Sequence, residues 1–378
     1  MTSVWSSLVG QARAVATLKR AVAGDMTHAW LFTGPPGSGR SNAAIAFAAA
    51  LQCERGGCGE CHSCHTAMIG SHEAISVTRT QKLSIGVDEV RELVRSAALS
   101  PVGDRWQVMI VEDADRLTEQ ACNALLKAIE EPTARTVWIL CAPTVEDVLP
   151  TIRSRTRLVV LATPAPEEIA AHLVARDGVT PERASYAARA SQGHIGRARA
   201  LATDEATLAR RRDVVSLPTQ LTSLGRCVIA AANLHDAATE ESAEMTSRID
   251  AREREDLDRT YGVVERGRRP RDYAPALRDL EKQQKTRAKR RVLDVVDRGL
   301  MDLVSVYRDA IAVQLGRVDG LVNEEQRPAV LELAHACTPE DNLARIEAVF
   351  TAREQMLEFN VPPLLALESM MMALRTSA

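Results

Sequence analysis

Residues 28–41 read HAWLFTGPPGSGRS, and this stretch decides the fold class. The apolar run HAWLFT has the length of a buried strand, and the glycine-rich segment GPPGSGRS leads from it into a helical pattern. That order matches the phosphate-binding pattern G-x-x-x-x-G-K-[ST], in which backbone N–H groups surround a phosphate at the start of a helix. The stretch therefore predicts a parallel α/β sheet with a phosphate loop after one strand.

The phosphate loop departs from its pattern at one position. Gly34, Gly37 and Gly39 would let backbone amides close around a phosphate, and Ser41 supplies the expected hydroxyl, but Arg40 stands where the pattern has lysine. Arginine is longer and planar, so it fits the same space poorly. A glycine-rich turn without a ligand is the alternative. We expect ATP hydrolysis to be inefficient, and nucleotide binding stays open.

Other short apolar runs predict the remaining strands of the sheet. They cover residues 74–77, 107–111, 137–142 and 158–161. Helical patterns lie between them, and the clearest spans 119–131 and ends at Pro132.

A pair of acids follows one of these strands. Residues 108–115 read VMIVEDAD, which resembles the strand end that holds Mg²⁺ beside a nucleotide, but Glu112 and Asp113 reverse the usual order of aspartate and glutamate. Mg²⁺ requires near-ideal octahedral geometry, so the reversal disturbs its position. A solvated acidic strand end is the alternative. Together with the loop, the pair indicates a degenerate nucleotide site in which bound ATP and Mg²⁺ are doubtful.

Four cysteines form a tight cluster. Cys53, Cys58, Cys61 and Cys64 follow the spacing C-x4-C-x2-C-x2-C. Four thiolates within twelve residues can complete a tetrahedral shell, which is typical of structural rather than catalytic zinc. The alternative is four unrelated free thiols. We predict one structural Zn²⁺.

Bulk composition bounds the class of protein. The chain has 378 residues, 46% of them apolar, and a formal net charge of −3. The length predicts two or three domains, and the charge excludes a uniformly basic nucleic-acid binder. No apolar run reaches the length of a membrane span, and the first residues do not read as a signal peptide. We expect a soluble cytoplasmic protein without membrane association.

The pattern along the chain predicts three domains. We expect a nucleotide-binding-type domain over 1–163, which includes the cysteine insertion 53–64, then a helical lid over 164–205 and an all-helical domain over 206–378. Residues 236–291 are about half charged, with both signs mixed. They predict a solvated or extended helical insertion.

Several segments together resemble the clamp-loader branch of the AAA+ family. They are LVGQ at 8–11, HAWLFTGPPGSGR at 28–40, LTEQACNALLKAIEEP at 117–132, LPTIRSRT at 149–156 and GHIGRARA at 193–200. The resemblance covers about residues 4–205, and the rest fits the family's helical collar domain by length and helicity alone. The insertion 236–291 has no counterpart in the family pattern, and the first two cysteines lie closer together than is usual there.

The resemblance implies a P-loop NTPase-like (AAA+) sheet domain, a small helical lid and a helical collar. Motor subunits of the gamma/tau type carry the lysine and the Asp-Glu pair that this chain lacks, so the delta-prime type is expected. In that type Arg155 would act as a trans arginine finger on a neighbour's ATP, although Thr156 replaces the family's cysteine. Arg197 corresponds to the sensor 2 arginine. The alternative for Arg155 is a basic strand edge.

The same resemblance implies partners. They are the gamma/tau and delta subunits, indirectly the sliding clamp, and primer-template DNA through the complex, in the replisome at the nucleoid. The chain would be a subunit of the DNA polymerase III holoenzyme with no polymerase active site and weak or absent ATPase activity. Two alternatives stay open: an active gamma/tau-like motor, and a zinc-stabilised DNA-binding module whose footprint is KQQKTRAKRR at 282–291.

Overall fold

The computed structural model describes residues 3–80, 84–98, 106–262 and 270–375. The chain divides into two compact units, Met1–Thr203 and Asp204–Ala378. Within the described residues, every helix is too short or too polar to span a lipid bilayer.

The first unit contains a five-stranded sheet in which all neighbouring strands are parallel. The strands are β1 (Ala29–Thr33), β2 (Ile75–Thr78), β3 (Gln107–Val111), β4 (Thr136–Ala142) and β5 (Arg157–Val160). Their order in space is β2-β3-β4-β1-β5. Central strands β1, β3 and β4 are buried at every residue, as expected for a sheet covered on both faces. This confirms the predicted parallel α/β fold and its five apolar runs.

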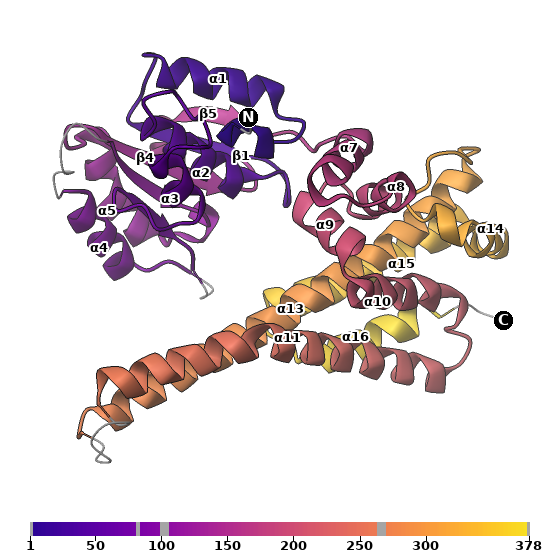
Figure 1. The fold of residues 1–378 in the computed structure, drawn as a ribbon. Coiled ribbons are helices and arrows are strands. Elements are labelled where there is room, and N and C mark those ends of the chain that lie inside the picture. Colours follow the sequence, from indigo (N-terminus) through magenta and orange to yellow (C-terminus); the bar gives the residue numbers. More distant parts are fainter. Residues whose placement is uncertain (1–2, 81–83, 99–105, 263–269, 376–378) are drawn as a thin grey trace. The chain divides into compact units, whose positions relative to one another are not determined.

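Helices cover both faces of the sheet (Figure 1). They are η1 (Val4–Ser7), α1 (Ala12–Val22), α2 (Arg40–Leu51), α3 (His62–Met68), α4 (Val87–Ala97), η2 (Ala114–Arg116), α5 (Glu119–Glu130) and α6 (Pro150–Arg153). Alternate side chains of the strands point to opposite faces. Trp30 and Phe32 of β1 therefore join the core with α1 and α2, while Leu31 joins the core with α4 and α5.

Three short helices complete the first unit. They are α7 (Pro166–Asp177), α8 (Pro181–Ala190) and α9 (Ile195–Thr203). Thr180 caps α8 by accepting a hydrogen bond from the N–H of Arg183, and Gly178 ends α7 in the left-handed conformation. Their small core is mostly alanine, with Ile169, Leu173 and Leu201 as its largest fully buried members. Val9 of the N-terminal segment packs against it.

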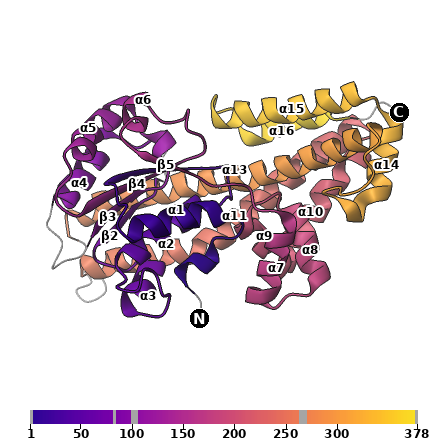
Figure 2. The same ribbon diagram turned by 90° about the horizontal axis from the view of Figure 1, so that it is seen from above.

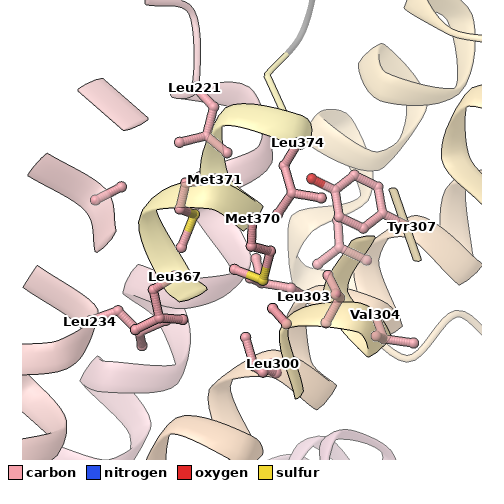
Figure 3. Close-up of a cluster of buried hydrophobic side chains, with 14 of the residues drawn as sticks. Leu221, Leu234, Leu300, Leu303, Val304, Tyr307, Leu367, Met370, Met371 and Leu374 are labelled. Atoms are coloured by element: carbon pink, nitrogen blue, oxygen red, sulfur yellow. The ribbon is translucent and has the colours of Figure 1, made fainter. Parts of the chain in front are cut away.

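In the residues that the structure describes, the second unit contains helices as its only regular elements. Its helices are α10 (Glu205–Ser216), η3 (Leu217–Thr219), α11 (Leu224–Thr260), α13 (Tyr273–Gln314), η4 (Glu324–Gln326), α14 (Arg327–Ala336), α15 (Pro339–Leu357) and α16 (Pro363–Ala373). Leu234 of α11, Leu300 and Leu303 of α13, and Leu367 and Met370 of α16 converge in one hydrophobic core (Figure 3). A buried arginine, Arg211, sits beside this core and donates to Asp302 and Asn323.

Helices α11 and α13 run side by side beyond that core (Figures 1 and 2). Among the described residues, none between 239 and 291 belongs to the hydrophobic core cluster. We call the described residues 236–262 and 270–291 the arm. It is helical over both halves, and polar bonds join them: Ser242 Oγ donates to the carbonyl of Ala288 at 3.2 Å, and Gln284 Nε2 donates to the carbonyl of Asp250 at 3.1 Å.

Candidate phosphate loop and metal site

The predicted phosphate loop connects β1 to α2. Gly37 and Gly39 adopt φ values of +84° and +90°, a left-handed conformation that glycine takes without strain. Ser38 between them is buried, and its Oγ has no hydrogen-bond partner among the described residues. Gln11 fixes the loop, because its Nε2 donates to the carbonyl oxygens of Ser38 at 3.3 Å and Ala162 at 2.7 Å. The backbone therefore keeps a shape that could surround a phosphate.

Arg40 turns back onto the loop itself. Its Nη1 donates to the carbonyl oxygen of Gly34 at 2.5 Å. The lysine of the standard pattern instead reaches the β and γ phosphates. The same guanidinium lies near Asp115, whose pKa is raised by burial and pulled down by the cations of Arg116 and Arg40. The cation at this position is thus partly engaged within the chain. Arg40 is the first residue of α2, and Ser41 is the second.

The two acids after β3 are also engaged. Arg79, the residue after β2, pairs with Glu112 through two hydrogen bonds, and the longer one joins Nη2 to Oε1 at 2.9 Å. This pair raises the pKa of Arg79. Asp113 accepts from the N–H of Thr80 at 3.3 Å and lies 4.0 Å from Arg116. Both carboxylate oxygens of Glu112 accept hydrogen bonds from the guanidinium of Arg79. Glu112 and Asp113 are therefore poorly arranged to hold Mg²⁺ beside a nucleotide.

The lid contacts the phosphate loop directly. A Cβ atom added to Gly37 would lie 2.4 Å from the ring of His194 and 2.6 Å from its Cα. His194 precedes α9, and its Nδ1 accepts from the N–H of Arg197 at 3.2 Å. The side chain of Arg197 is half-buried at the first turn of α9. The absence of a side chain at Gly37 is therefore what lets the lid close on the loop.

Arg155 lies near the N-terminal ends of the strands, away from the phosphate loop. It follows α6, donates to the carbonyl of Thr151 at 2.9 Å and to Ser154 Oγ at 3.1 Å, and forms an ion pair with Glu130 of α5. Its side chain is 40% exposed. The parallel register pairs Arg157 with Trp30, at the start of β1, whereas the phosphate loop follows the end of β1.

The four cysteines form one compact cluster. Their Sγ atoms all lie within 4.8 Å of one another, and Cys53 lies 3.6 Å from Cys58 and 3.7 Å from Cys61. Tetrahedral zinc with Zn–S bonds of about 2.3 Å requires sulfur atoms about 3.8 Å apart. The cysteine set therefore fits a four-coordinate metal ion.

Backbone groups favour the thiolate form at part of this cluster. The N–H groups of Glu60 and Cys61 lower the pKa of Cys58 to about 6. Burial raises the pKa of Cys64. The 3₁₀ helix η1 holds the cysteine loop from outside: Trp5 Nε1 donates to the carbonyl of Gly56 at 3.1 Å. The loop is thus anchored to the sheet unit independently of any metal.

Three residues to which the sequence assigned no role contact the predicted site residues. Arg79 pairs with Glu112, Glu130 pairs with Arg155, and His194 lies against Gly37. His194 lies inside the quoted segment GHIGRARA, and Glu130 lies inside LTEQACNALLKAIEEP, so their segments were noticed while their contacts were not. Arg79 carries no local signal, because only the adjacency of β2 and β3 brings it to Glu112.

Two family models match the chain. One described as "DNA polymerase III, delta subunit" matches residues 10–165, and one described as "DNA polymerase III, delta subunit, C terminal" matches residues 297–376.

Curated relatives match part of the chain. The DNA polymerase III subunit gamma/tau of Mycobacterium tuberculosis is 40% identical over 158 residues, which are 40% of this chain and 27% of that protein. The DNA polymerase III subunit delta' of Escherichia coli is 36% identical over 186 residues, which are 47% of this chain and 55% of that protein. The matched segments thus cover about a quarter and about half of these relatives. A gamma subunit-related protein of known structure from Thermotoga maritima is 16% identical, covering 76% of this chain and 99% of that chain with a TM-score of 0.37.

Proposed function

Because the chain belongs to the clamp-loader family of AAA+ proteins, we propose that it acts as a delta-prime-type subunit of the DNA polymerase III clamp loader. In this role it joins gamma/tau and delta subunits in a ring that opens the sliding clamp and places it on primer-template DNA. It works in the cytoplasm at the replisome. It contributes no polymerase active site.

The state of its own phosphate loop supports a non-motor role. A motor needs a cation free to reach the β and γ phosphates and a carboxylate free to hold Mg²⁺. Here Arg40 donates to Gly34 of the same loop, and Glu112 is paired with Arg79. ATP hydrolysis by this chain would require breaking both interactions in addition to overcoming the altered residue types.

The sheet register carries the proposal that Arg155 acts in trans. Gly34 lies beside Leu161, just past the end of β5, whereas Arg155 lies two residues before β5 begins at Arg157. With about 3.3 Å per residue in a parallel strand, the levels of Arg157 and Leu161 are about 13 Å apart. Arg155 therefore lies at the N-terminal end of β5, whereas the phosphate loop of the same chain lies at the C-terminal end. An exposed arginine there is available to a phosphate on another subunit.

Glu130 would release Arg155 at little cost. The two side chains are 40% and 42% exposed, and exposed ion pairs typically contribute about 0–1 kcal/mol. A neighbour's triphosphate carries more charge than one carboxylate and can bind the guanidinium through two oxygens. The pairing with Glu130 would then orient Arg155 in the free subunit and yield when the ring assembles.

The cysteine cluster supports a bound structural Zn²⁺. Cys53, Cys58, Cys61 and Cys64 would supply all four ligands, which leaves no open position for chemistry. The ion would fix the segment between α2 and α3. A zinc-stabilised DNA-binding module is the weaker alternative, because the cluster is anchored within the sheet unit by Trp5 and α2.

One observation favours an active gamma/tau-like motor instead. The gamma/tau relative is 40% identical over the matched segment, a higher value than the 36% of the delta' relative. Overall sequence identity does not show that the residues needed for hydrolysis are present. Arg40, Glu112 and Asp113 are the positions at which this chain differs from the pattern of a motor subunit.

Reconstitution tests the proposal. The full chain is combined with gamma/tau, delta, clamp and primed DNA, and DNA-stimulated ATP hydrolysis is measured. Arg155→Ala should join the ring normally and remove the contribution of the one ATP site that it completes, where an arginine finger is worth on the order of 10³–10⁵ in rate. Arg155→Lys should not restore the full rate, since an ammonium lacks the planar fork.

Arg153→Ala is the matched control. Arg153 is exposed and lies two residues away at the end of α6. It should leave both assembly and ATP hydrolysis unchanged. If the Arg155→Ala ring assembles and hydrolyses ATP at the wild-type rate, Arg155 is not a finger.

A further inference from the structure

The two halves of the arm carry opposite charge. Residues 236–260 of α11 contain nine acidic and four basic side chains, whereas residues 273–291 of α13 contain seven basic and two acidic ones. The bonds between Ser242 and Ala288 and between Gln284 and Asp250 place these halves against each other. The mixed charges of the sequence are thus sorted by helix.

Arginines between the two helices are already paired. Arg287 is 9% exposed and donates to Glu253 at 2.7 Å and to Asp250 at 2.5 Å. The hydrogen bond from Arg287 lowers the pKa of Glu253. Arg254 lies 3.7 Å from Glu281 across the same interface. These ion pairs join the halves of the arm, and the buried Arg287 is not available to a partner.

A second set of cations faces outward on α13. Arg278, Lys282, Lys285 and Lys289 are all exposed, and their spacing of four, three and four residues puts them on one face of the helix. We call these four residues the basic stripe. Within the part of the chain that the structure describes, none of them has a carboxylate partner; Arg278 Nε donates only to the carbonyl of Ala274 in its own helix.

The choice of residue also distinguishes the stripe. The chain has only six lysines among its 47 basic residues, and three of the six are in the stripe. Lysine keeps a compact, strongly hydrated charge on a flexible stem, whereas the paired positions use the rigid fork of arginine. The exposed lysines of the stripe therefore suit binding to mobile or regularly repeated anions. The paired arginines between the two helices instead form fixed ion pairs.

The geometry points to the phosphate backbone of a nucleic-acid duplex as the partner. From Arg278 to Lys289 the helix rises by about 16 Å, with successive charges about one turn apart, so the stripe can follow a regular row of phosphates. No aromatic residue occurs between Arg278 and Lys289, so this part of the helix offers no platform for stacking the bases of a single strand. A membrane surface would require an exposed apolar face beside the lysines, and the half-buried Leu277 and Leu280 of this helix do not provide one.

We propose that the basic stripe binds duplex DNA through its phosphates and without sequence preference. This contact goes beyond the clamp-loader role proposed above and does not rest on it, because it uses neither the phosphate loop nor Arg155. Contacts to phosphates alone position a duplex but do not read its bases.

Salt-dependent binding of the full chain to a fluorescent duplex tests this contact. Each phosphate contact contributes about −0.9 to the slope of log K against log salt concentration. The variant Lys282→Gln/Lys285→Gln/Lys289→Gln should therefore lose nearly three units of slope. Its affinity deficit relative to the wild type should then shrink about 40-fold as salt rises from about 50 to about 200 mM. A labelled single strand of equal length should bind more weakly to the wild-type chain and lose less in the variant.

A charge-matched variant controls for net charge. Arg212→Gln/Arg226→Gln/Arg308→Gln removes three exposed cations elsewhere in the second unit. It should keep the wild-type slope. Circular dichroism and thermal unfolding should be unchanged in both variants, since all six side chains are exposed.

Three results would overturn the proposal. One is an unchanged salt slope in the lysine variant, and another is an equal loss in the arginine control. The third is normal DNA binding by the lysine variant together with failure to join the reconstituted loader, which would assign the stripe to an acidic protein partner. A defect in Arg155→Ala leaves this outcome unaffected, so the two proposals fail separately.

Discussion

Helix α2 has one candidate site at each end, and the two sites differ in what they have kept. At its start, the phosphate loop keeps its backbone shape, with Gly37 and Gly39 in left-handed conformations, while Arg40 binds the loop itself. Just after its end, Cys53 begins a cluster whose four sulfur atoms have the spacing of a metal shell. Backbone shape can therefore persist after the side-chain chemistry has changed, and a motif is informative only when both are compared.

The difference follows from how each site is built. A nucleotide site needs side chains from several strands. A residue on a neighbouring segment, such as Arg79, can therefore form an ion pair with the acid that would hold Mg²⁺, here Glu112. The cysteine cluster draws all its ligands from twelve consecutive residues. Local ligand sets are harder to disturb by changes elsewhere in the fold.

The largest expected effect is at the cysteine end. Cys58→Ser removes one of four thiolates, and structural zinc in small sites binds with about 10–16 kcal/mol of apparent free energy. Bound zinc should fall from one ion per chain to near zero, measured by metal analysis of natively purified protein. Cys337→Ser, outside the cluster, should retain the ion. Hydrogen exchange should rise in residues 50–70 while the central strands stay protected.

That result would sharpen the contrast between the two ends of α2. Wild-type protein without zinc, or a Cys58→Ser variant that keeps a full complement, would show that the cluster is only four neighbouring thiols.

A smaller effect is expected where the lid meets the phosphate loop. Gly37→Ala adds a Cβ that meets His194 at 2.4 Å and also strains a left-handed backbone, so it should destabilise the first unit by about 2–4 kcal/mol. Gly39→Ala has the same backbone strain but no atom within 4 Å of the added Cβ, and should cost about 1–2 kcal/mol. Chemical denaturation of both variants measures the difference. Equal losses would mean that the lid does not pack on Gly37.

The smallest effect concerns the anchor of the cysteine loop. Trp5→Phe keeps most of the buried ring but removes the hydrogen bond to the carbonyl of Gly56, which should cost about 1 kcal/mol. Zinc should leave faster in the presence of a chelator, with an unchanged final stoichiometry. A release rate equal to that of the wild type would show that η1 does not support the metal loop.

The sequence predicted the sheet well because its signals are local. Each of the five apolar runs became a strand, and the helix expected at 119–131 ends at Glu130, just before Pro132. The arm was predicted as a helical insertion, but not as a charge-sorted pair, because helical spacing alone cannot tell which side of α13 meets α11. Arg287 and Lys285 look alike in the sequence, and only the fold buries one and exposes the other.

The sequence predicted the site residues themselves, but not the contacts that they make with distant segments. Arg40, Glu112 and the four cysteines stand out by residue type and spacing. Their partners do not: Arg79 reaches Glu112 because β2 lies beside β3, and His194 reaches Gly37 because the lid closes on the loop. Neither contact leaves a pattern in either segment.

Hydrolysis of ATP by the purified, zinc-loaded chain tests the central claim most directly. The account predicts no turnover above background with Mg²⁺ and primed DNA present, because Arg40 is bound to Gly34 and Glu112 to Arg79. Robust turnover that disappears in Arg40→Ala would contradict it and make this chain a motor.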